Sequence, residues 1–574
     1  MNNLVAHDPQ QIERYSTVQQ DGVIWNYWKN PPISIKTKFQ ITVTKNNQII
    51  YIKDGSIIRI DQNQDLSIQQ QYLTNLEQIY NLQWIGNYGQ KKQKISKWTA
   101  TWKGEKIQKV CGLYTNDGRK QGQWIEPIKN YWNKCKVYEV GQYVDDKRIG
   151  TWKQFYQDKQ IGIGEYNQKG QKFLKWIELS DNFWEYYQII YDGQYINDKK
   201  VGLWDILWRQ DINSPFKIIG GGFYEVINQE SSKIGKWIEL SDEFLEFSQP
   251  IYCGEYKNGK KVGKWDILWR QYQNQPFQLI GGGTYDQNKE NNIKIGKWIE
   301  LKFWRSKQIF YYGEYQKGKK IGRWNILFEG QMIGGGFYDD QNFDDVKQGP
   351  WIELKDRFGW DCQITYNGEY QNGQKVGRWD TLFEGQIIAG GYYKNEQPGE
   401  NVKIGNWREL SDGFQTDSQI IQYGEYKNGQ KVGRWDIEWR KNQNQPFQLI
   451  GGGSYGNDGQ YGVVKIEKWI EISDEFCDSS QITYVGSYLN GLKFGRWDTY
   501  CKQNGENKLI GGGSYENYKE QGTVKNGRWI DICDNYWTYS QITYVGEYQN
   551  AKKAGIWGEF INGTFKNDEI NYEN

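Results

Sequence analysis

Residues 251–301, IYCGEYKNGKKVGKWDILWRQYQNQPFQLIGGGTYDQNKENNIKIGKWIEL, decide the fold because they contain the same phrase twice. In each copy a Gly-x-Tyr triplet is followed by a turn and then by a Gly-Lys-Trp triplet. Almost all of the chain after residue 80 repeats this phrase, which predicts a repeat array rather than several separate globular domains. The structural markers of the two copies are Gly254, Tyr256, Gly263, Trp265, Gly283, Tyr285, Gly296 and Trp298.

Two classes of hairpin alternate along the array, each with its own marker tryptophan. The first class has Trp98, Trp152, Trp204, Trp265, Trp324, Trp379, Trp435, Trp497 and Trp557. The second class has Trp124, Trp176, Trp237, Trp298, Trp351, Trp407, Trp469 and Trp529. Successive first-class tryptophans lie 52 to 62 residues apart, which predicts about eight double units.

Each double unit has the pattern of four short strands. Asn-Gly pairs such as Asn258-Gly259 and Asn428-Gly429 supply the positive φ that a tight hairpin turn requires. No segment between the strands is long enough for a crossover helix, so we expect antiparallel pairing throughout. First-class turns keep one length from Tyr to Trp, whereas second-class turns vary, as surface loops do.

The regions outside the array are short. We expect residues 1–83 to be a polar arm followed by a capping segment, residues 84–565 to be the array, and residues 566–574 to be a polar tail. Residues 1–38 are expected to be loosely ordered. Residues 39–60 alternate apolar and polar side chains around Asp54-Gly55, which predicts hairpins, and Leu73, Leu76 and Ile79 have helical spacing.

The phrase around Trp265 resembles a MORN repeat, whose pattern is an aromatic residue, any residue, Gly, any residue, an aromatic residue and then spaced glycines. The matching residues are Tyr252, Gly254, Tyr256, Gly259 and Gly263. Trp265 stands where ordinary MORN repeats have a final Gly, and the repeats are longer. Both departures indicate the MORN-variant group, which also occurs in bacterial antitoxin-type proteins.

The resemblance implies an all-β fold: an elongated, twisted, antiparallel single sheet of MORN-like hairpins. It also implies a non-enzymatic scaffold in cytoskeletal, ciliary or membrane-associated assemblies. A β-propeller of about eight four-stranded blades is the alternative fold, because eight units with an Ile-Gly-Gly signature are similar to kelch blades. We favour the open sheet because the two halves of each unit resemble each other.

Composition limits the chemistry. His7 is the only histidine, which excludes histidine-dependent triads and His-rich metal sites. The triple glycines, for example Gly281–Gly283, do not continue into Gly-Lys-Ser/Thr, so we interpret them as bare backbone beneath aromatic rings. Lys+Arg 72 against Asp+Glu 70 is a balance that argues against a nucleic-acid binder. We therefore expect no catalytic, cofactor or metal site.

Two recurrent groups of side chains stand next to the marker tryptophans. Carboxylates such as Asp266 and Glu300 recur in like environments, which favours charge ladders over acid–base catalysis. The tryptophan face is interpreted as packing, with carbohydrate stacking as the alternative. The candidate partner-binding feature is a basic edge, in which the turn lysines project: Lys199, Lys200, Lys260, Lys261, Lys319, Lys320, Lys375, Lys431, Lys493, Lys552 and Lys553.

These features predict a non-enzymatic scaffold or adaptor that binds protein partners, with an anionic membrane surface as a second partner class. A lipid- or carbohydrate-binding module is the first alternative, and an antitoxin- or immunity-like binding protein is the second. Seven scattered cysteines without a CxxC pair predict free thiols. The first residues lack the basic and apolar pattern of a signal peptide, so we expect a cytoplasmic protein, in a cytoskeletal or membrane-associated assembly.

Overall fold

The computed structural model describes most of the chain and divides it into two compact units. The described residues are 14–26, 33–44, 48–54, 56–62, 73–91, 93–287, 292–304, 307–340, 345–356, 358–359, 362–397, 400–411, 414–416, 418–457, 462–474, 476–503, 505–518, 522–533, 536 and 541–572. The first unit comprises Met1–Trp84, Thr101–Lys106 and Glu409–Asn574, and the second comprises Ile85–Ala100 and Ile107–Arg408.

A separate four-stranded sheet precedes the array in the first unit. Its strands, in the order β1-β2-β3-β4, are β1 (Arg14–Asn26), β2 (Ile33–Thr44), β3 (Gln48–Lys53) and β4 (Ser56–Gln62). The helix α1 (Leu76–Asn81) follows, with Asn75 as its N-cap, and it buries Leu76 and Ile79 against Phe39 and Tyr51. Among the described residues, no helix is long and apolar enough to cross a membrane.

The predicted hairpins around residue 54 and the short predicted helix are therefore confirmed. The expectation that residues 1–38 are loosely ordered is wrong where the structure describes them. Residues 14–26 and 33–38 lie in β1 and β2, which pair along their length. Polar side chains do not prevent this pairing, because the backbone ladder supplies the hydrogen bonds.

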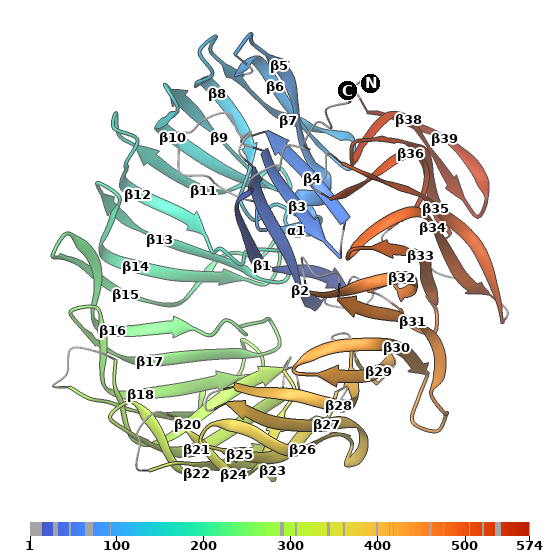
Figure 1. Ribbon diagram of the computed structural model, residues 1–574. Coiled ribbons are helices and arrows are strands. Elements are labelled where there is room, and N and C mark those ends of the chain that lie inside the picture. The colour runs from blue at the N-terminus through green and yellow to red at the C-terminus, as the bar shows by residue number, and fades with distance from the viewer. Residues whose placement is uncertain are drawn as a thin grey trace, which may run out of the picture. The chain divides into compact units, whose positions relative to one another are not determined.

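The array strands of the second unit follow one another in chain order (Figure 1). They are β5 (Leu82–Tyr88), β6 (Lys94–Trp102), β7 (Glu105–Tyr114), β8 (Lys120–Pro127), β9 (Val137–Val144), β10 (Lys147–Tyr156), β11 (Lys159–Tyr166), β12 (Lys172–Leu179), β13 (Gln188–Ile196), β14 (Lys199–Arg209), β15 (Lys217–Ile227), β16 (Glu230–Leu240), β17 (Gln249–Lys257), β18 (Lys260–Arg270), β19 (Gln278–Tyr285), β20 (Lys294–Trp304), β21 (Lys307–Gln316), β22 (Lys319–Phe328), β23 (Gln331–Tyr338), β24 (Lys347–Leu354), β25 (Ile364–Gln371), β26 (Gln374–Phe383), β27 (Gln386–Gln397) and β28 (Glu400–Leu410). The strands β5, β6, β7 and β28 each contain a boundary between the two units, so part of each strand belongs to the first unit.

The array continues in the first unit with strands of the same kinds. They are β29 (Gln419–Lys427), β30 (Gln430–Arg440), β31 (Gln448–Asn457), β32 (Val463–Ile472), β33 (Ile482–Leu489), β34 (Leu492–Gln503), β35 (Glu506–Asn517), β36 (Thr523–Ile532), β37 (Ile542–Gln549), β38 (Lys552–Ile561) and β39 (Thr564–Tyr572). The predicted polar tail at 566–574 is thus wrong, because β39 pairs with β38 and the Tyr572 hydroxyl donates to the Lys103 carbonyl at 2.8 Å.

Antiparallel pairing is continuous along the array strands of each unit. From β7 to β28 each strand pairs with the next one along the chain. The same holds from β29 to β39. A propeller blade ends its ladder after four strands, so the propeller alternative is wrong and the all-β antiparallel array of hairpins is confirmed.

The first-class turns are two-residue turns held in place by the neighbouring hairpin. Asn258 and Gly259 have φ of 51° and 76°, the left-handed conformation that was predicted from the Asn-Gly pair. The Gly259 amide also donates to the Lys233 carbonyl on β16 at 2.9 Å. The same bond recurs from Gly318 to Lys294, from Gly373 to Lys347 and from Gly491 to Lys465. This contact explains the constant length of the first-class turns, since an insertion would break it.

The glycines provide room for the tryptophans. A Cβ on Gly283 would overlap the Trp298 ring, and a Cβ on Gly254 would overlap the Trp265 ring. The middle glycine Gly282 has a φ of +128° and lies against the Trp265 carbonyl. The interpretation as bare backbone beneath aromatic rings is therefore confirmed for the third glycine of the triplet, whereas Gly281 and Gly282 lie against the backbone of neighbouring strands.

Candidate functional site

The marker aromatic residues form an edge-to-face row along one face of the sheet. In the second unit, Trp and Tyr rings alternate from Tyr88 to Trp407, and in the first unit they alternate from Tyr426 to Tyr572. Neighbouring ring centroids lie 5.0 to 6.4 Å apart, in the T-shaped geometry that aromatic pairs prefer. We call this face the aromatic face.

Each marker tryptophan in this row is buried, and most of them donate the ring N–H to a backbone carbonyl. Trp265 is 2% exposed, and its Nε1–H donates to the Glu255 carbonyl at 3.3 Å. Trp237 donates in the same way to the Phe223 carbonyl at 3.2 Å. Such rings are core material, and their burial leaves no open tryptophan face for a sugar to stack on.

A lysine four residues before each tryptophan covers its ring. The Lys261 ammonium lies 3.9 Å from the Trp265 ring centroid, and the Lys233 ammonium lies 4.5 Å from that of Trp237. The pairing recurs in both hairpin classes, with Arg148 replacing lysine over Trp152. Cation–π contacts of this kind stabilise by about 1 to 2 kcal/mol when they are partly desolvated.

One carboxylate in each double unit holds two of these cations. Glu239 pairs with Lys261 at 2.8 Å and with Lys233, and it accepts a hydrogen bond from the Tyr256 hydroxyl at 2.8 Å. We call each such carboxylate with its two cations and tyrosine a carboxylate clamp. The clamp carboxylates of the second unit are Glu126, Glu178, Glu239, Glu300 and Glu353, and those of the first unit include Glu471 and Asp531.

The clamps shift the protonation equilibria of their members. Burial raises the pKa of Glu471, but Lys493 and Lys465 lower it more strongly, so that the pKa falls to about 2. The pKa of Glu239 is likewise lowered by Lys233 and Lys261 in spite of burial. Burial and then the Glu239 charge raise the pKa of Tyr256. The carboxylates thus stay ionised and the tyrosines stay neutral across the neutral pH range.

The predicted basic edge divides into two groups of lysines. The second lysine of each first-class turn lies 3.7 to 4.3 Å from a tryptophan ring centroid: Lys200, Lys261, Lys320, Lys375, Lys431, Lys493 and Lys553. The expectation that these lysines project from the edge is wrong, because a ring and a clamp carboxylate hold each ammonium on the aromatic face. Of the others, Lys199, Lys260 and Lys319 are partly exposed and Lys552 is exposed.

The carboxylates that follow the first-class tryptophans lie on the opposite face. Asp266 pairs with Lys264 at 2.9 Å, Asp380 with Arg378 at 2.7 Å, and Asp498 with Arg496 at 2.6 Å. Each pair joins neighbours two residues apart on one strand rather than across strands. The predicted charge ladders are therefore confirmed for the clamp carboxylates, which connect different strands, and are wrong for Asp266, Asp380 and Asp498 of the opposite face, whose pairs stay within one strand.

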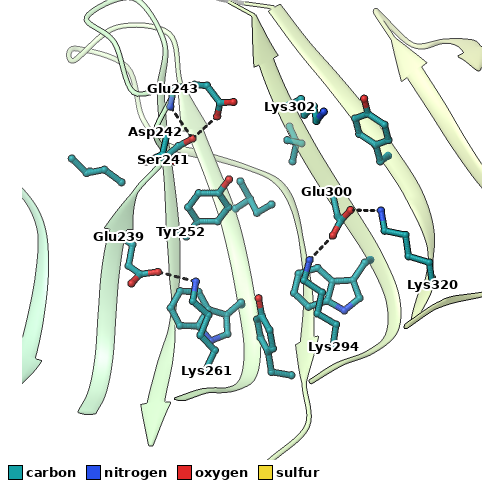
Figure 2. Close-up of a pocket in the computed structure, with 17 residues that line it drawn as sticks. Glu239, Ser241, Asp242, Glu243, Tyr252, Lys261, Lys294, Glu300, Lys302 and Lys320 are labelled. Carbon is teal, nitrogen blue, oxygen red and sulfur yellow. Dashed lines mark hydrogen bonds and ion pairs between the residues drawn. The ribbon is translucent and has the colours of Figure 1, made fainter. Parts of the chain in front are cut away.

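An open cavity of about 530 Å³ lies on the aromatic face between two clamps of the second unit. Figure 2 shows Glu239 with Lys261 on one side and Glu300 with Lys294 and Lys320 on the other. Its rim includes Ser241, Asp242, Glu243, Tyr252 and Lys302, and the Ser241 hydroxyl donates to Glu243 at 2.8 Å. Among the described residues, no Lys or Arg pairs with Asp242 or Glu243.

The clamps were not predicted from the sequence, although a signal for them is present. Every marker tryptophan has a cation four residues earlier, and second-class tryptophans have an acid two residues later. Residues two and four apart on a strand share a face, so this spacing places the three groups together. The first lysines of the second-class strands, such as Lys233 and Lys294, were not singled out at all.

In the described ranges, no three His, Cys, Asp or Glu side chains are grouped so as to hold a metal ion, and the seven cysteines are thiols rather than members of disulfides. No protein-family model and no curated protein matches the chain. The repeated antiparallel hairpins stand as the structural finding, and the assignment to the MORN-variant group remains a proposal.

Proposed function

We propose that this chain is a non-enzymatic repeat scaffold that binds protein partners along the sheet face opposite the aromatic face. A column of exposed aliphatic side chains on that face carries the proposal. In the second unit, Ile218, Leu279, Met332 and Ile387 are 65%, 60%, 64% and 60% exposed. In the first unit, Leu449 and Leu509 are 62% and 53% exposed.

The column has a fixed spacing that a partner can match. Its four members in the second unit lie on β15, β19, β23 and β27, so four strand spacings, or about 19 Å, separate them. Each is directly opposite a partly buried leucine: Leu207, Leu268, Leu327 or Leu382. Regularly repeated apolar exposure is typical of an interaction surface, whereas scattered single residues are not.

The alternatives have less support. A carbohydrate-binding module needs open ring faces, but the marker tryptophans are buried beneath lysines. A lipid-binding basic edge needs available ammonium groups, but one lysine of each turn is held in a clamp. The antitoxin- or immunity-like role, the MORN-variant assignment and a cytoskeletal, ciliary or membrane-associated assembly depend on the family resemblance alone.

The experiment compares partner capture by the full chain and by a column variant from extracts of the source cells. The variant carries Ile218→Ser, Leu279→Ser, Met332→Ser and Ile387→Ser. A matched control carries Ser in place of the exposed Lys264, Arg323 and Arg378 on the same face. We expect the column variant to lose proteins that the control retains. Identical sets of captured proteins from all three chains would overturn the proposal.

A further inference from the structure

The aromatic face of the first unit already binds a hairpin, and that contact identifies a second binding site. The turn between β3 and β4 lies against the repeat that contains the Glu471 clamp. The Lys53 ammonium pairs with Asp474 at 3.5 Å, and the Asp54 carbonyl accepts from the Tyr488 hydroxyl at 3.2 Å. Lys53 is only 8% exposed, so its side chain is buried in this contact.

Apolar side chains complete this contact. Ile50 and Ile57, from β3 and β4, form a buried cluster with Val524 on β36. The hairpin also shields the clamp beneath it. The Lys493 side chain is 13% exposed, whereas its counterpart Lys261 in the second unit is 22% exposed.

Most of the residues that line the cavity of the second unit recur at the corresponding sequence positions of the repeats that the hairpin contacts. Asp242, Lys261 and Glu300 of the cavity correspond to Asp474, Lys493 and Asp531. Ile293 corresponds to Val524 in the apolar cluster. No residue that the structure describes fills the cavity.

We propose that the Glu239–Glu300 cavity binds a β-hairpin of a partner protein whose turn carries a lysine followed by an acidic residue. The partner's lysine pairs with Asp242, as Lys53 pairs with Asp474. Its acidic residue lies toward Lys261, and Lys302, where the hairpin site has Cys533, adds a second positive charge on the rim. Aliphatic residues beside the turn pack toward Ile293. This inference goes beyond the scaffold role proposed above, because it places a second binding site on the aromatic face.

The test uses the full chain and a cyclised peptide with the sequence of residues 48–62, QIIYIKDGSIIRIDQ, carrying a photoreactive group. We expect saturable binding with cross-links to β17–β21. Asp242→Asn is expected to weaken binding by about fivefold, the size of one partly exposed ion pair. Asp266→Asn makes the same charge change in the same repeat on the opposite face, and it is expected to leave binding unchanged.

A second peptide, with Met in place of the lysine, separates the ion pair from general charge effects. It should bind about fivefold more weakly to the unsubstituted chain and should be insensitive to Asp242→Asn. No saturable binding, or binding indifferent to Asp242→Asn, would overturn the inference. If the full chain instead self-associates in sedimentation and Lys53→Met abolishes the association, the occupant is a second copy and the partner assignment is wrong.

Failure of the hairpin-binding proposal can be distinguished from failure of the scaffold proposal. Peptide binding by the column variant tests the cavity alone, because the substituted residues lie on the other face. Loss of captured proteins from the column variant, together with a peptide that does not bind, would contradict the hairpin site and leave the scaffold intact.

Discussion

At the residue scale, stability depends on close approach of tryptophan rings to glycine backbone. Trp324 lies over Gly313 so tightly that a Cβ on Gly313 would enter the ring. The ring is 2% exposed and is covered by Lys320 at 3.9 Å. A single methyl group there must displace a ring that is fixed on several sides, and dense packing does not absorb such a change.

We predict that Gly313→Ala destabilises the surrounding hairpins by about 3 kcal/mol, the upper part of the range for overpacking. Gly89→Ala is the control, because a Cβ there would meet only the flexible Gln93 side chain. It should cost less than about 0.5 kcal/mol. Amide hydrogen exchange of β21 and β22 is the measurement, since arrays unfold in sections. Equal exchange rates in both variants would contradict the packing argument.

The clamps make stability depend on pH. The pKa of Glu471 is about 2 in the folded chain, against an ordinary value of 4.5. A lowered folded pKa contributes stability that is complete above the unfolded pKa and is lost as pH falls towards the folded pKa. We predict a loss between about pH 5 and pH 2, on the order of 3 kcal/mol from this residue.

Glu471→Gln should remove this part of the acid dependence and destabilise the chain at pH 7, because Lys465 and Lys493 lose their shared carboxylate. Asp498→Asn, on the opposite face, is the control, and it should lose stability with falling pH as steeply as the unsubstituted chain. Thermal unfolding at pH 7, 4 and 3 compares the three chains. If Glu471→Gln loses stability with acid as steeply as the unsubstituted chain, the Glu471 clamp is not the cause.

At the element scale, the two turn classes have different mechanical roles. The first-class turn at Asn258 is bonded to Lys233 on the neighbouring hairpin and places Lys261 over Trp265. The second-class turn after Asp286 varies in length among repeats. The first-class turn therefore takes part in the packing between neighbouring hairpins. The second-class turn can differ in length from one repeat to the next.

We predict that inserting Gly-Ser between Asn258 and Gly259 lowers the stability of β16–β18 by about 2 kcal/mol or more, through loss of the turn hydrogen bond and of the clamp geometry. The same insertion after Asp286 should change stability by less than about 0.5 kcal/mol. Thermal unfolding and amide exchange provide the comparison. Equal effects of the two insertions would show that the Lys233 contact does not constrain the turn.

At the scale of the whole molecule, the array repeats one surface many times, whereas the part of the chain that the structure describes contains one sheet of the β1–β4 kind. In the first unit that sheet covers one copy of the surface, through Lys53 and Ile57. The corresponding surface of the second unit is the cavity bounded by Glu239 and Glu300. Near-identical repeats thus acquire different roles through what contacts them.

We predict that Lys53→Met with Ile57→Asp releases the hairpin and raises amide exchange in β33–β36 by about tenfold, as expected for removing contacts worth about 1.4 kcal/mol. Exchange in β16–β20, the matching strands of the second unit, should not change. A uniform increase in both places would indicate general unfolding rather than release of one contact.

The sequence alone determined the strands, their order, the turns and the packing of tryptophan on glycine. Alternating side chains, Asn-Gly pairs and a repeated phrase act between neighbours in the chain, and each strand pairs with the next one. Only the tertiary structure decided that the second turn lysine lies over a ring, as Lys261 does over Trp265. The same turn sequence is compatible with a solvated ammonium, and the ring and Glu239 become neighbours only when the hairpins pair.

The contact between Lys53 and Asp474 was likewise beyond sequence reasoning, because these residues are far apart in the chain and no periodicity connects them. Several repeats offer an acidic residue like Asp474, so sequence alone does not say which repeat the hairpin contacts. Local patterns therefore determined how the array is built. Packing between distant segments decided which of its surfaces is covered and which remains open.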